Sequence, residues 1–159
     1  MYTFMVHAIH QAKVAFCKNE IPVGAVIIKN NEVISCDHNQ VNCNMDVTAH
    51  AEILCIKSTA KKLKTTNLSN CDIYTTLEPC AMCAQAIAFS KIKRIYFAAY
   101  DKKFGAVENG VRLFHSGTYN HIPEIYGGIN QQKSIELLQQ FFAKIRKRHI
   151  KNSKFINKS

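Results

Sequence analysis

The sequence lacks the features that mark long linkers, exported proteins and membrane proteins. Its 159 residues include three prolines and six glycines, which leave little room for a long flexible linker. The first residues, MYTFMVHAIHQAKVAF, lack the charged start and the small-residue cleavage site of a signal peptide. No stretch reaches about 18 uninterrupted apolar residues, the length that a membrane-spanning helix needs. Because 47% of the residues are nonetheless hydrophobic, we expect one globular domain without membrane association.

The sequence also lacks the even number of cysteines that a disulfide framework requires. It contains seven cysteines and no export signal. Disulfide pairs are therefore not expected, and a reducing compartment fits this composition. We predict a cytoplasmic protein.

Acidic residues are scarce, above all at the C-terminal end. Eleven acids stand against 21 lysines and arginines, which gives a formal net charge of +10. This excess favours a polyanionic partner such as nucleic acid, although a basic end that only aids solubility has the same composition. We expect one domain over residues 1–150 and a basic tail over residues 151–159. From residue 144 onward there is no acid, and the seven basic residues are Lys144, Arg146, Lys147, Arg148, Lys151, Lys154 and Lys158.

Hydrophobic periodicity and turn residues predict alternating helices and strands after a hairpin. Asn30-Asn31 is a typical tight turn between two β-rich runs. Such an order implies a mixed sheet with helices on both faces. In the last helix, the apolar positions Ile135, Leu138, Phe142 and Ile145 are expected to face the core. The predicted elements are helix 2–17, strands 23–29 and 32–36, a helix from near Thr48 to 63, strand 71–77, helix 80–90, strand 94–99, a short strand within 124–128, and helix 132–150, with irregular segments over 37–47 and 100–123.

A C-x-x-C pair lies at the start of one of these helices. Cys80 and Cys83 are three residues apart, so they share one helix face. A helix N-terminus favours negative charge, which promotes the thiolate form that metals bind. On its own, the same spacing also fits a thioredoxin-type redox pair.

A second motif changes the interpretation of this pair. His50 and Glu52 begin another helix, and H-x-E followed by P-C-x-x-C is the signature of zinc deaminases. Three protein ligands, His50, Cys80 and Cys83, would leave one tetrahedral position open for water, as in catalytic zinc sites. His50 and Glu52 are two residues apart and do not share a helix face. Both can therefore reach one metal site only if that site lies over the helix N-terminus. We therefore expect two helix starts, near residues 49 and 80, to converge on one zinc ion, with Glu52 as the proton shuttle.

Beyond these motifs, the chain resembles the bacterial tRNA-specific adenosine deaminases of the cytidine deaminase-like superfamily. This resemblance implies a three-layer α/β/α fold with a central mixed sheet of about five strands, one zinc per chain, and a homodimer that binds a tRNA anticodon stem-loop. It also implies that Asn39 bonds the target base, that Asp101 lies near the target nucleotide, and that Asn120 and His121 line the substrate loop. The matching stretches are EIPVGAVIIKNNEVI (20–34), HN (38–39), TAHAEI (48–53), YTTLEPCAMCAQAI (74–87), AYDKKFGA (99–106), NH (120–121) and FF (141–142).

The activity implied is deamination of adenosine to inosine at the wobble position of an anticodon. The alternative is a deaminase of free guanine or cytosine, whose zinc motif can be nearly identical but which needs no basic C-terminus. A non-catalytic zinc-stabilised RNA-binding module is a third possibility. Such a module would use four protein ligands, and it would not need Glu52 beside them.

Overall fold

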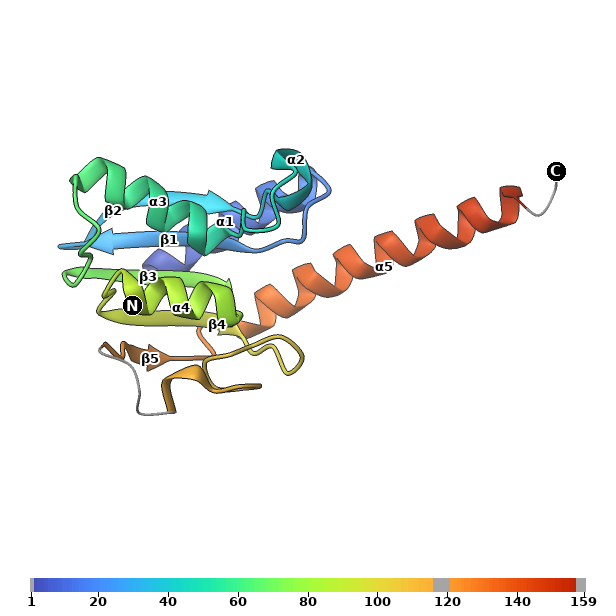
Figure 1. The fold of residues 1–159 in the computed structure, drawn as a ribbon. Coiled ribbons are helices and arrows are strands. Elements are labelled where there is room, and N and C mark those ends of the chain that lie inside the picture. The colour runs from blue at the N-terminus through green and yellow to red at the C-terminus, as the bar shows by residue number, and fades with distance from the viewer. Residues whose placement is uncertain (1, 116–120, 157–159) are drawn as a thin grey trace.

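The computed structural model describes residues 2–115 and 121–156. Five strands form one mixed sheet in the order β2-β1-β3-β4-β5, and helices cover both of its faces (Figure 1). The predicted three-layer α/β/α architecture is confirmed. The elements are α1 (Tyr2–Cys17), β1 (Gly24–Lys29), β2 (Glu32–His38), α2 (Val41–Asn44), α3 (Ala51–Leu63), β3 (Cys71–Leu77), α4 (Ala81–Phe89), β4 (Arg94–Ala99), the 3-10 helix η1 (Leu113–His115), β5 (Glu124–Tyr126) and α5 (Gln131–Ile156).

The hairpin of β1 and β2 supplies the antiparallel half of the sheet. Asn30 and Asn31 both have positive φ, 50° and 62°, as the predicted tight turn requires. β1 pairs antiparallel with both β2 and β3, whereas β3 with β4 and β4 with β5 pair in parallel. The uninterrupted apolar run of β1 follows from this central position, because both faces of the strand are buried.

Two apolar clusters fill the space between the sheet and the helices. Val26 and Tyr74 belong to the cluster that packs α1 against the sheet. Their chain neighbours Ile27 and Ile73 belong to the cluster under α3 and α4, as the alternation of side chains along a strand requires. α3 and α4 therefore lie on one face of the sheet, and both begin at the same end of it (Figure 1).

The segment between β2 and α3 differs from the prediction. β2 continues to His38, and a one-turn helix, α2, occupies part of the segment predicted to be irregular. A single turn is too short to show helical periodicity. α3 begins at Ala51 and not near Thr48, because His50 takes the N-cap position. Thr48 instead donates a hydrogen bond to Asp46 Oδ1.

The last helix also differs from the prediction. α5 continues to Ile156, past the domain end predicted at residue 150, and its C-terminal part extends away from the sheet (Figure 1). Phe142, an expected core residue, is 44% exposed, whereas Phe141 is 4% exposed. That prediction is wrong because Phe141 packs edge-on against Phe16 of α1, a contact that periodicity within α5 does not show. Among the helices in the described part of the chain, none is long and apolar enough to cross a membrane.

The two adjacent phenylalanines provide a matched test of this packing. Phe141→Ala removes a buried ring and should lower the free energy of unfolding by about 3 kcal/mol. Phe142→Ala removes an exposed ring and should change it by less than about 1 kcal/mol. Urea denaturation followed by circular dichroism measures both values. Equal losses in the two variants would contradict the packing of α5 on α1.

Candidate active site

Two helix N-termini meet at one end of the sheet, and each carries an unusual N-cap residue. His50 is the N-cap of α3 and Cys80 is the N-cap of α4, yet neither side chain caps its helix. N-cap positions usually hold Ser, Thr, Asp or Asn, whose side chains bond to backbone N–H groups of the first turn. Here the two side chains face each other, and Cys80 Sγ lies 3.7 Å from His50 Nδ1. The predicted convergence of two helix starts is confirmed.

Cys83 completes a cluster with the dimensions of a zinc site. Its Sγ lies 3.5 Å from His50 Nδ1, and the ligand atoms of all three residues lie within 4.8 Å of one another. Tetrahedral zinc with Zn–S of about 2.3 Å and Zn–N of about 2.0 Å holds its sulfur and nitrogen ligands about 3.5 Å apart. Within residues 2–115 and 121–156, this is the only such cluster of three or more His, Cys, Asp or Glu side chains.

The two cysteines of the cluster together carry one negative charge, which suits a cation. A hydrogen bond from the Cys83 thiol lowers the pKa of Cys80 to about 4; burial opposes this shift, and hydrogen bonding to His50 supports it. The same hydrogen bond, together with burial, raises the pKa of Cys83. At neutral pH, Cys80 is therefore a thiolate that shares the proton of Cys83. A divalent cation can replace that proton, because metal binding displaces protons from thiol ligands.

Glu52 is buried in the first turn of α3 and is only partly paired. It is 3% exposed, and its Oε1 accepts a hydrogen bond from Thr75 Oγ1 over 3.3 Å. Oε2 is buried and has no partner among the described residues, and burial raises the pKa of the carboxyl group. A buried carboxylate oxygen without a donor is costly unless water or a ligand supplies one. Oε2 therefore marks a position for water or substrate beside the ligand cluster.

A pocket of about 1070 Å³ opens over the cluster. His50, Glu52 and Cys80 line one part of it. Apolar side chains that precede β1 or belong to α2 and α5 line much of the rest. This volume lies at the upper end of the range of about 300–1,000 Å³ that ligand pockets occupy.

The predicted substrate-contacting residues divide into three groups. Asn39 and Asp101 line the pocket. His121 is not among the lining residues; its Nε2 lies 2.7 Å from the carbonyl oxygen of Ile92 and donates to it. Asn120 lies outside the described residues.

Asn39 is held by a buried carboxylate that the sequence analysis missed. Glu20 is 1% exposed, and it accepts hydrogen bonds from Asn39 Nδ2 at 3.2 Å, Asn42 Nδ2 at 3.0 Å and the backbone N of Cys43 at 2.7 Å. This carboxylate therefore fixes the orientation of the Asn39 amide and ties α2 to the pocket wall. The signal available in the sequence is a lone acid directly before the apolar run IPVGAVII.

Asp101 opens the loop on the other side of the pocket. Its Oδ1 accepts hydrogen bonds from the backbone N of Lys103 at 2.9 Å and of Phe104 at 3.0 Å, so it caps a turn while lining the pocket. Its own backbone N donates to Glu78 Oε2 at 3.0 Å. Glu78 is the second buried carboxylate that the sequence analysis missed, although it directly precedes PCAMC.

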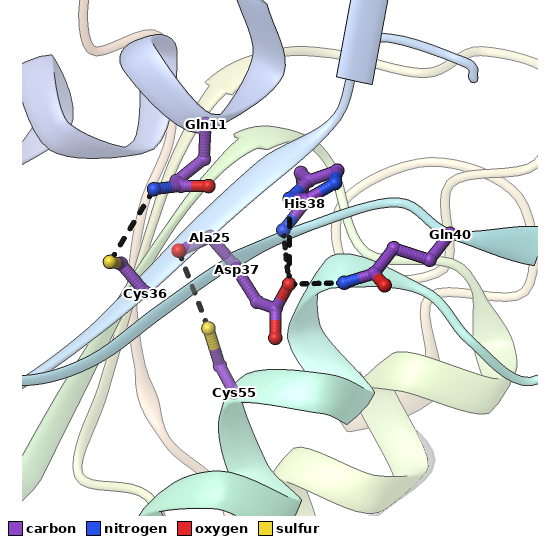
Figure 2. A network of polar contacts seen from close by, with 7 residues as sticks. All are labelled: Gln11, Ala25, Cys36, Asp37, His38, Gln40 and Cys55. Carbon is purple, nitrogen blue, oxygen red and sulfur yellow. Dashed lines mark hydrogen bonds and ion pairs between the residues drawn. The ribbon is translucent and has the colours of Figure 1, made fainter. Parts of the chain in front are cut away.

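Two of the remaining cysteines make packing contacts outside the ligand cluster. Cys55 is buried and donates to the carbonyl oxygen of Ala25 over 3.3 Å (Figure 2). Burial raises its pKa, which keeps it a thiol. Cys36 is exposed and accepts a hydrogen bond from Gln11 Nε2 at 3.5 Å (Figure 2).

The chain on both sides of Asn39 is held by one more carboxylate. Asp37 Oδ1 accepts hydrogen bonds from the backbone N of His38 and from Gln40 Nε2 (Figure 2). Burial lowers the pKa of His38. Asn39 thus leaves β2 in a segment fixed by bonds before and after it.

A three-layer α/β/α domain that brings His50, Cys80, Cys83 and Glu52 together at one site defines a zinc-dependent deaminase. In agreement, the profile of the family described as cytidine and deoxycytidylate deaminase zinc-binding region matches residues 2–99. The tRNA-specific adenosine deaminase of Rickettsia bellii is 48% identical over 144 residues, which cover 89% of this chain and 99% of that protein. The chain belongs to the family of tRNA-specific adenosine deaminases.

Solved structures agree with this assignment. One, solved for A-to-I editing by tRNA:A34 deaminases at the wobble position of transfer RNA, is 44% identical with a TM-score of 0.83, covering 85% of this chain and 98% of that chain. A guanine deaminase from Nitrosomonas europaea has a TM-score of 0.77, covering 89% of this chain and 84% of that chain. Because it is only 21% identical, this second likeness shows the fold alone.

We predict that the purified protein holds one zinc ion per chain. Cys80→Ala and Cys83→Ala each remove a ligand and should reduce the zinc content to well below one per chain. Cys17→Ala, which changes an exposed cysteine outside the cluster, should retain it. Elemental analysis measures all three, and full zinc in a Cys80→Ala/Cys83→Ala protein would rule out this ligand set.

Proposed function

We propose that the protein catalyses hydrolytic deamination of adenosine to inosine at the wobble position of a tRNA anticodon. The observation that carries this proposal is the 48% identity to the R. bellii tRNA-specific adenosine deaminase across 89% of the chain. The zinc-binding profile ends at residue 99, so the likeness extends well beyond motifs that deaminases of other substrates share.

For the metal, we propose that His50, Cys80 and Cys83 hold one zinc ion. Three protein ligands leave one coordination position open, which is the pattern of catalytic zinc. When bound, zinc acts as a Lewis acid that lowers the pKa of water. The described part of the chain brings no fourth His, Cys, Asp or Glu to the cluster, which argues against a purely structural zinc module.

We assign proton transfer to Glu52. Thr75 holds Oε1, which leaves the unpartnered Oε2 to accept a proton from water and to deliver one to the leaving amino group. Adenosine and water thereby give inosine and ammonia. A raised pKa suits this role, because a base works best when its pKa lies near the working pH.

The assignment of the substrate contacts rests on the family resemblance. Asn39 and Asp101 line the pocket, which supports their placement at the target base and its neighbours. Asn120 and His121 are assigned to the substrate loop by resemblance alone. The target base must leave its stack to enter the pocket, which costs least in a single-stranded loop such as an anticodon.

The proton-transfer assignment predicts that Glu52→Ala keeps zinc and loses turnover. Loss of general acid–base help should reduce kcat by about 10²- to 10⁴-fold. Elemental analysis and inosine formation measured on the same sample separate the two effects. Glu32→Ala changes an exposed acid in the hairpin and is the control. A Glu52→Ala protein with near-normal turnover would exclude the assigned role.

The substrate itself is tested by incubating the zinc-loaded protein with unmodified tRNA, free guanine and free cytosine. We expect inosine in the tRNA and no ammonia from either free base. Turnover of guanine or cytosine without tRNA editing would replace this proposal with the free-base alternative.

We further propose a homodimer that works in the cytoplasm, where tRNA is decoded. The proposal is supported by the family assignment and by the size of an anticodon stem-loop, which is large for one 159-residue chain to surround. Closed dimers are also the commonest oligomers. Light scattering at micromolar concentration should give twice the chain mass of 18.0 kDa. An active monomer would contradict the proposal.

We propose that exposed basic residues of α5 bind the phosphates of tRNA. Lys144 already serves another contact, because its Nζ donates to Asn19 Oδ1 at 2.9 Å and lies 5.2 Å from the Phe16 ring. Arg146, Lys147 and Arg148 are exposed. They follow Phe142, which lines the pocket. They therefore lie on the part of α5 that continues beyond the pocket.

Replacing Arg146, Lys147 and Arg148 by alanine should weaken tRNA binding without changing the edited adenosine. Phosphate contacts make affinity depend on salt, so the slope of log K against log salt should fall by about 2. Filter binding at several salt concentrations measures the slope. Lys57, Lys61 and Lys62 of α3 provide a control triple with the same charge change. Unchanged affinity at every salt concentration would show that this part of α5 does not contact RNA.

A further inference from the structure

Glu78 accepts five hydrogen bonds from one loop. The residue is 3% exposed, and its Oε1 accepts bonds from the backbone N of Val107 at 3.2 Å, Glu108 at 2.8 Å and Asn109 at 2.8 Å. Its Oε2 accepts bonds from the backbone N of Asp101 at 3.0 Å and from Asn109 Nδ2 at 2.6 Å. All five donors are neutral N–H groups of the loop 101–109, and no ion pair to Glu78 occurs within the described residues.

The same loop contacts the segment between β3 and α4 that carries Cys80. The backbone N of Ala106 donates to the carbonyl oxygen of Pro79 at 2.9 Å, and Gly105 forms a β-bridge with Cys80. A Cβ on Gly105 would lie 2.6 Å from Glu78 Oε2 and 2.4 Å from the carbonyl oxygen of Asp101. Only glycine therefore lets the loop close around the carboxylate.

The first four residues of this loop line the active-site pocket. Asp101, Lys102, Lys103 and Phe104 all line that pocket. Phe104 is 64% exposed, and Lys103 Nζ lies 4.9 Å from its ring. An exposed aromatic ring beside two lysines suits a nucleic-acid substrate, because bases stack on aromatic rings and phosphates pair with cations.

We propose that Glu78 is a positioning residue that fixes the loop 101–109 as the substrate-binding wall of the pocket. Glu78 itself lines the pocket, but both of its oxygens accept hydrogen bonds from the loop, so it acts by holding the loop in place. This inference depends on the proposed function only because an anticodon stem-loop is the substrate with which KM is measured. The order of the loop itself can be measured without any substrate.

The chemistry of the five bonds makes the negative charge essential. Both oxygens face N–H donors, and hydrogen bonds to a carboxylate are stronger than those to a neutral acceptor. In Glu78→Gln the new NH₂ group must face at least two of these donors, so bonds are lost although the shape of the side chain is nearly unchanged. The loop should then loosen while His50, Cys80 and Cys83 keep their places.

The experiment compares Glu78→Gln with the wild-type protein and with Glu32→Gln, an exposed control with the same change of charge. We expect Glu78→Gln to retain one zinc and to raise KM for an anticodon stem-loop about tenfold or more, with kcat within about threefold of wild type. Amide hydrogen exchange at Asp101, Val107, Glu108 and Asn109 should become about tenfold faster or more. Glu32→Gln should match wild type in all four measurements.

Asn109 supplies a graded pair of variants that leave Glu78 in place. Asn109→Ala removes the shortest of the five bonds, whereas Asn109→Asp places a second carboxylate against Glu78. KM and amide exchange should therefore rise in the order wild type, Asn109→Ala, Asn109→Asp. This order follows from the charge placed beside the Glu78 carboxylate. If Glu78→Gln does not fold, the order of the Asn109 variants tests the proposal in its place.

Unchanged exchange in the loop, or loss of zinc from Glu78→Gln, would overturn the proposal, because the carboxylate would then not order the loop or would act on the metal site. Equal effects of Asn109→Ala and Asn109→Asp would also overturn it. If the protein edits no stem-loop at all, the proposed function fails. Faster exchange with full zinc retention would still support the role of Glu78 in ordering the loop.

Discussion

The structure depends on bringing one imidazole nitrogen and two thiol sulfurs together over two helix N-termini. α3 follows β2 and α4 follows β3, so the two helices lie on the same face of the sheet and begin at the same end. At these starts, His50 and Cys80 occupy N-cap positions that would ordinarily hold capping side chains. Local helix stability is given up at both places so that ligand atoms can meet. Departures from local preference of this kind are expected where function sets the sequence.

Three buried carboxylates surround the pocket, and their hydrogen bonds separate their roles. Glu20 accepts three N–H groups and Glu78 accepts five. Through these bonds both carboxylates hold segments of the pocket wall in place. Glu52 accepts one hydroxyl, and its second oxygen has no partner within residues 2–115 and 121–156. A carboxylate with satisfied oxygens is suited to structure, whereas one with an open oxygen in a pocket is suited to proton transfer.

The features predicted from the sequence are those that short-range patterns specify. The positive φ angles of Asn30 and Asn31 are local, and the H-x-E and P-C-x-x-C motifs each lie within one helix start. The missed features depend on contacts between distant segments. Phe141 is buried because α1 lies beside α5, and the Glu78 bonds to the loop join residues 23 to 31 positions apart. Nothing within the sequence around PCAMC shows which loop will close over the preceding glutamate.

The fold alone leaves the substrate undetermined, as the guanine deaminase with a TM-score of 0.77 at 21% identity illustrates. In this chain the walls of the pocket come from the segment around Asn39, the loop 101–109 and α5. Two of these walls are each held by a buried carboxylate, Glu20 or Glu78, in addition to backbone contacts. This arrangement separates the parts physically: side chains that face the pocket can change while the carboxylates keep the loops in place. The reactive centre itself is held by α3 and α4, at whose N-termini His50 and Cys80 lie.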